Sequence, residues 1–590
     1  MNYEWKIKNA PDNLIEEYMQ KLHISRILAT GLINNNVSID VADMIFNAID
    51  YERLYKPLNI ARIHEAALLL KEYLSQPNTL IQIFADYDTD GITSAAIACK
   101  VLRKSGEPLQ RETPNITYYI PERKNGYGLS VAFAEQFINF ADQCPDLKIL
   151  VLTVDNGITA KPAIDILKQK PNIEVLVTDH HEPDYENGLT PTTECICVDP
   201  HLDKQSEGEF LAGCGVIFNV LQELENICGL NNKFTKQMYY LAAIGTIGDM
   251  MHLDLYHACL VQLGLFQLNM LDTVYWIQYI KNQVKINNFV AKDIAFTISP
   301  IINACGQMGN AALAFDMLIA EDEAEGLAKA EQAYQLYQAN KSETKTARDA
   351  VEIDILENYI SNHPFIMYPM PTNRPGLVSK VATHIAKQIG MPIILWAETE
   401  ENQNDEIITG SARNDTSIPV LNIMREAVKN GLADAAEGHA YAFGVKLFRS
   451  KLTELQEFLD EKIRSYGRDI GAGEGRSLTV DCVISTNDIN VKNMKELEAF
   501  PFAKNLVAPV VMIKEAKICG VKVSKNNAKN VCYTIQSPDA AYPIDIWAWN
   551  IKPDAYDATK HTKIDMIGTI ERNFMKPDFA TLSVLDLRCY

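Results

Sequence analysis

The sequence has no apolar run long enough to cross a membrane, and its cysteines form no Cys-x-x-Cys pair. A membrane-spanning helix needs about 20 mostly apolar residues, so we expect no membrane partner. Residues 1–6 lack the basic and then apolar pattern of a signal peptide. The 12 scattered cysteines therefore indicate reduced thiols in a cytoplasmic protein, rather than disulfides or a zinc site.

The chain also has fewer basic than acidic residues. The chain has 55 Lys and Arg residues against 76 Asp and Glu residues, which gives a formal net charge of −21. This balance argues against a protein that coats nucleic acid without specificity, because such binding depends on neutralising phosphates. It does not exclude a nuclease, since a metal site accounts for part of the negative charge and a local basic groove can lie within an acidic surface. Solubility alone explains the charge equally well.

A chain of 590 residues should hold three or four domains, at roughly 150 residues each. Strands and helical stretches alternate in the first third, which predicts right-handed crossovers and a mainly parallel sheet. Short β-type runs near the C-terminus predict a small β-barrel, and Gly471–Gly475 is the clearest linker. The expected parts are a helical segment at 1–78, a parallel-sheet α/β lobe at 79–309, a helical connector at 310–362, a second α/β lobe at 363–470 and the barrel at 476–590.

Three apolar runs end in clusters of carboxylate and imidazole side chains. Ile81–Ala85, Leu150–Val154 and Val175–Thr178 have the composition of buried parallel strands. In an open α/β sheet the reactive site lies beyond the carboxyl ends of the strands, so the clusters should meet on one rim. Their members are Asp86, Asp88, Asp90, Asp155, Asp179, His180 and His181.

Carboxylates this close together repel one another and raise one another's pKa. Divalent cations would relieve the repulsion, and a mixed set of Asp and His suits manganese or a similar metal. A calcium EF-hand is excluded, because Ile97 stands where the pattern after Gly91 requires Glu. Turn formation and capping are the alternative use of Asp-rich segments, but three clusters after three strands favour metal. Two ions would support phosphodiester or pyrophosphate hydrolysis, and the ligands do not distinguish between them.

Two short polar motifs lie at or near the ends of strands and loops in the second α/β lobe. Ser411 and Arg413 offer a hydroxyl and a guanidinium group, a combination that suits a phosphate. A surface ion pair is the alternative role of Arg413. Gly438 and His439 form the second motif.

The last domain has its densest basic stretch close to aromatic residues. Lysines beside exposed rings would suit single-stranded nucleic acid, because bases stack on aromatic side chains. Equally, the two tryptophans could belong to the core of the barrel. The residues concerned are Lys514, Lys517, Lys522, Lys525 and Lys529 with Tyr533, Trp547 and Trp549.

With these motifs the chain resembles the DHH phosphoesterase family, and within it the bacterial exonucleases that are specific for single-stranded DNA. The resemblance covers nearly the whole chain and rests on the order of the motifs. In chain order these are Asp86–Gly91, Tyr119–Arg123 with Gly126–Gly128, Asp155–Gly157, Asp179–His181, Leu211–Val216, Gly245–Asp249, Ser411–Arg413 and Gly438–His439. The family fold implies a parallel-sheet catalytic lobe, a helical connector, a DHH-associated lobe and an oligonucleotide-binding (OB) barrel.

By this resemblance the chain should hold two Mn²⁺ or Mg²⁺ ions. The implied metal ligands are Asp86, Asp88, Asp90, Asp155, His180 and Asp249, with Asp155 as the bridge. Asp86 and Asp179 belong in or just behind the ligand shell, where outer carboxylates orient ligands. The implied catalytic residues are Asp155, His180 and His181, the last as a ligand or as a transition-state contact. The implied substrate-binding residues are Tyr127, Asn303, Ser411, Arg413, Gly438 and His439.

The expected function is metal-dependent exonucleolytic hydrolysis of single-stranded DNA, from the 5′ end by resemblance. The resemblance also implies a monomer, with single-strand-binding protein or a helicase as protein partner. One alternative is a phosphodiesterase of the same superfamily that acts on very short oligonucleotides or cyclic dinucleotides and has no need of the barrel. The other is a DNA-binding replication or repair protein with weakened catalysis.

Three departures from the family pattern indicate a divergent branch. The family's Pro-Arg-Ile-Asn-Ala-x-Gly-Arg reads Pro300–Gln307 here, with Ile301 and Gln307 in place of the two arginines. The Gly-Gly-His motif begins with Glu437, and the histidine usual before the glycine that matches Gly376 is missing. The missing arginines slightly favour the DNA-binding alternative, whereas the complete set of metal ligands opposes it.

Overall fold

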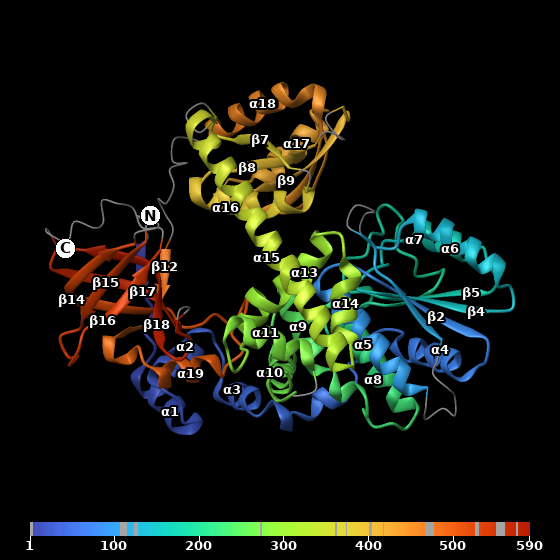
Figure 1. Cartoon of the computed structure of the whole chain (residues 1–590), viewed down its shortest axis with the longest axis horizontal. Coiled ribbons are helices and arrows are strands. Elements are labelled where there is room, and N and C mark those ends of the chain that lie inside the picture. The colour runs from blue at the N-terminus through green and yellow to red at the C-terminus, as the bar shows by residue number, and fades with distance from the viewer. Residues whose placement is uncertain are drawn as a thin grey trace. The chain divides into compact units, whose positions relative to one another are not determined.

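Two compact units make up the computed structural model of this chain (Figure 1). One unit contains residues 7–337 and 479–590, and the other contains residues 338–478 with residues 1–6. The structure describes residues 4–106, 115–122, 128–271, 274–359, 363–372, 374–399, 404–416, 418–466, 477–524, 530–549, 561–573 and 576–590.

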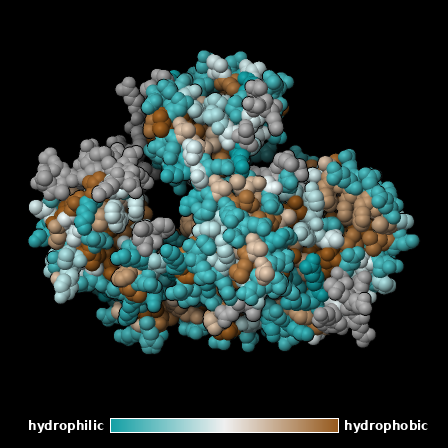
Figure 2. Space-filling view, viewed as in Figure 1, coloured by the Kyte–Doolittle hydropathy of each residue, from teal (hydrophilic) through white to brown (hydrophobic). Residues whose placement is uncertain are grey.

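The surface and the thiols agree with the composition. Figure 2 shows hydrophilic residues over most of the visible face. Among the described helices, none has the length and apolar character that a membrane crossing needs. All 12 cysteines are free thiols.

The first unit begins with helices, as the sequence predicts for this region. Ser25 and Ser38 start two of them, and each hydroxyl accepts a hydrogen bond from an amide three residues on, of Leu28 and Val41, both at 3.3 Å. The helices are α1 (Asp12–Leu22), α2 (Arg26–Asn34), α3 (Ile39–Phe46) and α4 (Ile63–Ser75). Before them, the short strand β1 (Glu4–Ile7) pairs with β12 (Ser477–Val480).

A five-stranded, fully parallel sheet follows, which confirms the predicted α/β lobe. Its order is β3-β2-β4-β5-β6. The apolar side chains of its strands are buried on both faces, by α6 and α7 on one side and by α4, α5 and α8 on the other (Figure 1). The elements are β2 (Thr79–Ala85), α5 (Thr89–Ser105), β3 (Ile116–Tyr119), α6 (Val131–Gln143), β4 (Lys148–Val154), α7 (Lys161–Leu167), β5 (Ile173–Thr178) and β6 (Ile196–Val198).

Helices complete the lobe and lead out of it. They are α8 (Gly213–Ile227), α9 (Tyr239–Gly248), α10 (Leu255–Met270), α11 (Tyr275–Val284), α12 (Ala291–Asp293), α13 (Ser299–Gln307), α14 (Ala311–Ile319) and α15 (Glu323–Asp354). The stretch expected as one connector at 310–362 thus contains α14 and the much longer α15. Helix α15 begins in the first unit and ends in the second.

The second unit contains a mixed sheet of order β10-β11-β9-β8-β7, in which β7 and β8 are parallel and the other neighbours are antiparallel. Its own apolar core confirms a second α/β lobe. The elements are β7 (Ile366–Pro371), α16 (Val378–Ile389), β8 (Ile393–Glu398), β9 (Ile407–Arg413), α17 (Val420–Lys429), β10 (Ala433–His439), β11 (Ala442–Phe448) and α18 (Leu452–Ser465).

The C-terminal region is a six-stranded sheet, as the short β-type runs predict. Its order is β16-β15-β14-β17-β18, and β13 pairs in parallel with β14. The edge strands β16 and β18 contact each other, so the sheet curls toward a barrel. The elements are β13 (Cys482–Ile484), α19 (Val491–Glu498), β14 (Val511–Val523), β15 (Val531–Gln536), β16 (Ile544–Ala548), β17 (Lys563–Arg572) and β18 (Ala580–Cys589).

The barrel and the parallel-sheet lobe share one continuous apolar core. Phe46 of α3 packs edge-on against Phe500, with 5.5 Å between ring centroids. Gly31 of α2 lies so close to Pro509 that a Cβ there would be 2.2 Å from the proline ring. The barrel is therefore built into the first unit. The predicted linker, Gly471–Gly475, lies outside the described residues.

Candidate metal centre

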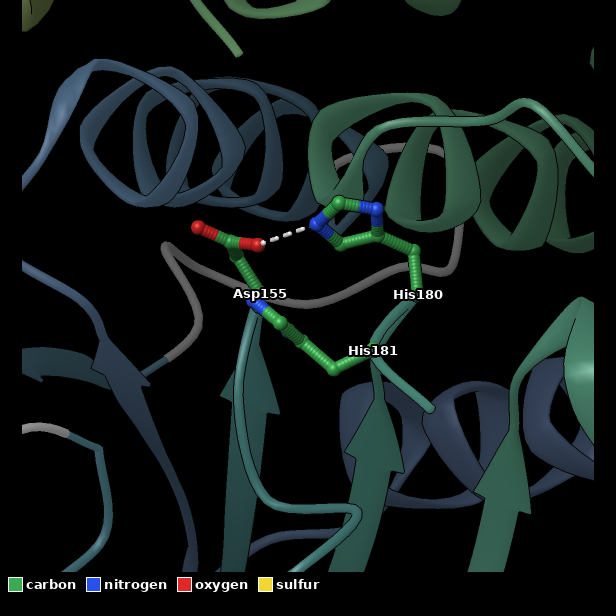
Figure 3. A group of neighbouring side chains, drawn as sticks. All are labelled: Asp155, His180 and His181. Carbon is green, nitrogen blue, oxygen red and sulfur yellow. Dashed lines mark ion pairs between the residues drawn. The ribbon is translucent and has the colours of Figure 1, made fainter. Parts of the chain in front are cut away.

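The predicted acidic clusters meet at the carboxyl ends of neighbouring strands. Asp86 follows β2, Asp155 follows β4, and Asp179, His180 and His181 follow β5. Figure 3 shows the ring of His180 turned toward the carboxylate of Asp155 above the ends of the strands. The rim predicted from the three apolar runs is present.

His180 lies among three carboxylates. Its Nε2 atom is 3.1 Å from Asp155 Oδ1, 3.6 Å from Asp90 Oδ2 and 3.8 Å from Asp249 Oδ2. Asp249 comes from the end of α9, so a residue distant in the sequence completes the cluster. Burial lowers the pKa of His180, which favours the neutral imidazole that a metal ion requires.

Three overlapping groups have the geometry to hold a metal ion, since the ligand atoms in each lie within 4.8 Å of one another. Asp155 belongs to two of them, and His180 also belongs to two. The groups are Asp86 with Asp88 and Asp155, Asp90 with His180 and Asp249, and Asp155 with His180 and His181. All the predicted ligands are brought together.

Helix N-termini hold two of the carboxylates in place. Asp88 caps α5, and its Oδ1 atom accepts hydrogen bonds from the amides of Asp90 at 3.0 Å and Gly91 at 3.1 Å. Asp90 accepts from the first amides of α8, Gly213 at 2.6 Å and Cys214 at 2.9 Å. The positive ends of two helix dipoles therefore stabilise negative charge in the cluster.

Two glycines let these helices approach the carboxylates. A Cβ on Gly213 would lie 2.6 Å from Asp155 Oδ1, and a Cβ on Gly245 would lie 2.8 Å from Asp90 Oδ1. Real side chains do not approach so closely. The motifs that contain these glycines therefore bring backbone against the acidic side chains.

Asp155 occupies a backbone conformation that few residues adopt. Its φ angle is 61°, in the left-handed region that Asp and Asn tolerate better than most residues. Its amide donates to the carbonyl of Thr178 at 3.0 Å, which ties the end of β4 to the end of β5. Burial and the charges of Asp90 and Asp88 raise the pKa of Asp155 well above its usual range.

Asp86 provides the clearest test of fit for a cation. Its carboxylate is buried, and neither oxygen has a hydrogen-bond partner among the described residues. Burial and the charge of Asp88 raise the pKa of Asp86 to about 8. Burial and the charges of Asp90 and Asp88 likewise raise the pKa of Asp249 to about 8. An unpartnered buried carboxylate among other acids is costly unless a cation neutralises it, so the residues fit divalent metal.

Asp179 orients the two histidines. Its Oδ1 atom accepts from the amide of His180 at 2.8 Å and lies 2.7 Å from Nδ1 of His181, and Oδ2 accepts from the amide of Ile158 at 2.9 Å. Burial opposes ionisation, but the hydrogen bonds and charge of His181 outweigh it and lower the pKa of Asp179. Against burial, the bond to Asp179 raises the pKa of His181 to about 9. Asp179 thus contacts the histidines rather than the other carboxylates, and its place just behind the ligand shell stays a prediction.

Asp199 is a buried carboxylate that sequence reasoning missed. It follows β6, which is parallel to β5 and ends at the same rim. Its Oδ1 atom accepts from the amide of His201 at 2.8 Å, and its Oδ2 atom has no partner among the described residues. Burial raises the pKa of Asp199 to about 6, with a contribution from the charge of Asp179. An Asp directly after a short apolar run was the available signal.

Asn303 lies behind the metal centre. Its Oδ1 atom accepts a hydrogen bond from the amide of Thr89 at 2.9 Å, next to Asp88 at the start of α5. This contact gives Asn303 a positioning role, and its predicted contact with substrate stays a prediction. Tyr127 lies outside the described residues.

Arg413 lies in a cradle of neutral oxygen atoms. Its guanidinium donates to the hydroxyls of Thr383 at 2.9 Å, Ser411 at 2.8 Å and Ser379 at 2.7 Å. Burial lowers the pKa of Arg413, and among the described residues no carboxylate pairs with it. The part of this lobe that the structure describes thus offers no support for a surface ion pair of Arg413. A partly buried cation held by hydroxyls is suited to an anion.

Strand register brings the second phosphate motif beside the first. His439 of β10 pairs with Ala442 of β11, and Ala442 pairs in turn with Arg413 of β9. Gly438 has a φ angle of 132°, and a Cβ there would lie 2.9 Å from Phe443 Cα. The two motifs therefore occupy one end of three neighbouring strands.

The aromatic residues of the barrel divide between core and surface. Tyr533 is buried, whereas Trp549 is 57% exposed and stacks on Trp547 with 5.6 Å between ring centroids. Trp547 and Lys522 both pair with Cys532, from opposite sides. The core interpretation of the two tryptophans is therefore wrong for Trp549, and Trp547 is only half-buried. Lys514 and Lys517 lie on β14, and Lys525 and Lys529 lie outside the described residues.

Comparison with protein families finds three domains in order along the chain. The DHH family N-terminal domain matches residues 80–246, the DHHA1 domain matches residues 362–465, and the RecJ OB domain matches residues 480–578. The single-stranded-DNA-specific exonuclease RecJ of Bacillus subtilis is 26% identical over 545 residues, which is 90% of this chain. The chain spans only 64% of the length of that relative.

Two solved structures are similar to the chain. The crystal structure of RecJ in complex with Mn²⁺ from Thermus thermophilus has a TM-score of 0.75 at 22% identity, and the match covers 99% of this chain and 79% of that one. The crystal structure of exonuclease RecJ bound to manganese has a TM-score of 0.56 at 26% identity, over 70% of this chain and 97% of that one. With all three domains in this order, the chain is a RecJ-like member of the DHH family.

Proposed function

We propose that this protein is a metal-dependent exonuclease that degrades single-stranded DNA. The main support is Asp155, which belongs to two of the three ligand groups found among the described residues, as a residue that bridges two ions would. The relatives named single-stranded-DNA-specific exonuclease, and the manganese-bound RecJ at 26% identity, support the same activity and metal.

The proposed ligands are Asp86, Asp88, Asp90, Asp155, His180 and Asp249, and each has oxygen or nitrogen atoms directed into the cluster. Two bound divalent ions would supply an activated water and neutralise charge on the phosphodiester. Asp179 holds the ring of His181 through a 2.7 Å contact. The bond to Asp179 raises the pKa of His181, and the 44% exposed side chain of His181 would donate to a phosphate oxygen as negative charge develops there.

Arg413 would bind a second phosphate of the strand. Its cradle of Ser379, Thr383 and Ser411 hydroxyls fixes the planar guanidinium without neutralising it. A fixed guanidinium can form two parallel hydrogen bonds to one phosphate. Gly438 and His439 are proposed to line the same phosphate site, because strand register brings them level with Arg413.

The outer face of the barrel would bind bases farther along the strand. Trp549 offers an exposed ring at the end of β16, and Lys522 and Lys517 lie on β14, from which β16 is separated by β15. Exposed aromatic rings beside lysines bind single strands by stacking and by neutralising phosphates.

The second candidate from the sequence is a phosphodiesterase on small substrates. Ile301, which stands in place of a family arginine, is fully buried in the core, so its position contributes no charge to the binding of either kind of substrate.

The test uses labelled single-stranded DNA, duplex DNA and a cyclic dinucleotide, each with Mn²⁺ or with a chelator. The proposal expects stepwise shortening of the single strand from its 5′ end, much slower attack on the duplex, and no reaction with chelator. Fast hydrolysis of the cyclic dinucleotide with an intact single strand would favour the second candidate. Binding of single strands without any hydrolysis would favour the DNA-binding alternative.

A further inference from the structure

The barrel touches the chain segment that follows the ligand Asp249. This segment, 250–254, links α9 to α10 and is short. Asn505 lies in the barrel between α19 and β14. Its side-chain amide binds this segment through both the oxygen and the nitrogen. The amide of Leu253 donates to Asn505 Oδ1 at 2.7 Å, and Asn505 Nδ2 donates to the carbonyl of Leu253 at 2.9 Å.

Neighbouring contacts tie the same segment to the other side of the metal centre. Asn505 Nδ2 also lies 3.3 Å from Nε2 of His252. The ring of His252 packs against Phe210, with 4.5 Å between centroids. Phe210 comes shortly before the first turn of α8, whose amide at Gly213 binds Asp90. Asn505 therefore contacts the backbone that follows Asp249, and through the rings of His252 and Phe210 it is connected to the start of α8, which binds Asp90.

The loop that contains Lys504 and Asn505 is anchored on both sides. Phe500 packs on Phe46 before it, and Val507 pairs with Asn35 after it.

We propose that Asn505 is a positioning residue of the metal centre, through which the docked barrel holds Asp249 in the geometry that binds metal. This inference rests on the proposed function only in taking Asp249 as a ligand. The loss of a group that orients a ligand from behind commonly lowers metal affinity about 10- to 100-fold. The barrel thus has a second role, separate from holding DNA on its outer face.

The chain offers a matched control for Asn505. Asn35 clamps the backbone of Val507 in the same way, because its Nδ2 donates to the carbonyl at 3.1 Å and its Oδ1 accepts from the amide at 3.1 Å. Both asparagines fasten the same loop between the barrel and the rest of the unit. Asn35 lies at the end of α2, which has none of the proposed ligands.

The experiment titrates Mn²⁺ alone into the metal-free full chain and measures free Mn²⁺ by electron paramagnetic resonance. Asn505→Ala should raise the weaker dissociation constant about 10-fold, whereas Asn35→Ala should leave it at the parental value. Thermal unfolding of both variants in chelator should show similar losses of stability. On a short oligonucleotide, Asn505→Ala should need more Mn²⁺ for half its maximal rate, and saturating Mn²⁺ should restore that rate.

Asn505→Asp is the variant to test if the alanine variant does not fold. It keeps the oxygen that accepts from the amide of Leu253 and loses the nitrogen that donates to the carbonyl of Leu253. It should also bind Mn²⁺ more weakly than the parent. A parental dissociation constant in the folded Asn505 variants, or an equal change in Asn35→Ala, would overturn the positioning role alone. A parent that binds no Mn²⁺ would overturn the metal centre itself, so the two failures are distinct.

Discussion

Nε2 of His180 lies 3.1 Å from Oδ1 of Asp155, although the two residues follow different strands of the sheet. Both side chains are nearly buried, at 9% and 2% exposed. Neither strand alone forms the site, and the contact exists because β4 and β5 are parallel neighbours. The chemistry we propose depends on this convergence.

Replacing Asp155 should abolish hydrolysis and leave the fold intact. Its loss removes a ligand shared by two groups, so we expect the rate to fall roughly a thousandfold, or about 4 kcal/mol of activation free energy. Asn is the better substitution, because Ala is disfavoured at a φ of 61°. Rates come from single-turnover assays on a labelled single strand, and thermal unfolding in chelator checks the fold. Near-parental turnover of Asp155→Asn would disprove the assignment.

Without metal, the protein should become less stable as the pH rises from about 6 to about 9. The pKa of Asp86 and of Asp249 is raised from 3.8 to about 8. The folded chain therefore binds more protons than the unfolded chain in that window, and its stability falls as they leave. The pKa of His181, raised from 6.5 to about 9, acts in the same direction.

The measurement is the unfolding temperature in chelator at several pH values. Asp86→Asn should show a shallower fall than the parent, because one titrating group is gone. Asp165→Asn, on the exposed side of α7, is the control and should follow the parent. A parental slope in Asp86→Asn would contradict the raised pKa.

Arg413→Lys should weaken the binding of short single strands. Lysine keeps the charge but loses the paired donors of guanidinium, and the expected cost is about 1–3 kcal/mol. Titration of a fluorescent oligonucleotide in Ca²⁺ or chelator measures the affinity. Arg449→Lys is the control, because Arg449 lies in the same lobe and pairs with Glu398 at 2.8 Å. Equal effects of the two substitutions would remove the special role of Arg413.

Trp549→Ala should weaken the binding of long single strands more than that of very short ones. Loss of one stacking ring costs about 1–3 kcal/mol per base, and only a long strand reaches the barrel. Tyr542→Ala is the control, since Tyr542 is 80% exposed on the same domain but is outside the tryptophan pair. The measurement is the affinity of each variant for a long and for a very short single strand. A loss of affinity that is equal for both lengths would count against base stacking on Trp549.

The sequence was sufficient to predict the site where strands end in side chains of the right type. The ends of β2, β4 and β5 each gave a local signal, an apolar run followed by Asp or His. Asp199 gave a weaker one, because β6 is short and the Asp stands alone. The cradle of Arg413 could not be predicted, since Ser379 and Thr383 lie on α16 and reach the guanidinium only through packing.

The predicted linker before the barrel lies outside the described residues, and the sequence did not reveal that the barrel packs on the catalytic lobe. From the sequence alone, we would expect a chain cut at Gly471–Gly475 to retain a complete catalytic lobe. In the structure the barrel shares the apolar core of that lobe, and Phe500 and Pro509 fill space beside α2 and α3. Truncation would expose this core, so substitutions such as Trp549→Ala test the barrel more cleanly. The contact between Asn505 and Leu253 has no local sequence pattern, so it could be found only from the folded structure.

The central claim is that the acidic rim is a centre for two metal ions, and the most direct test counts them. Native mass spectrometry of the metal-free chain, titrated with Mn²⁺ near pH 8, gives the number bound per chain. The account predicts two ions in the parent and loss of at least one in Asp155→Asn. Saturation at one ion or none in the parent, or an unchanged count in Asp155→Asn, would contradict it.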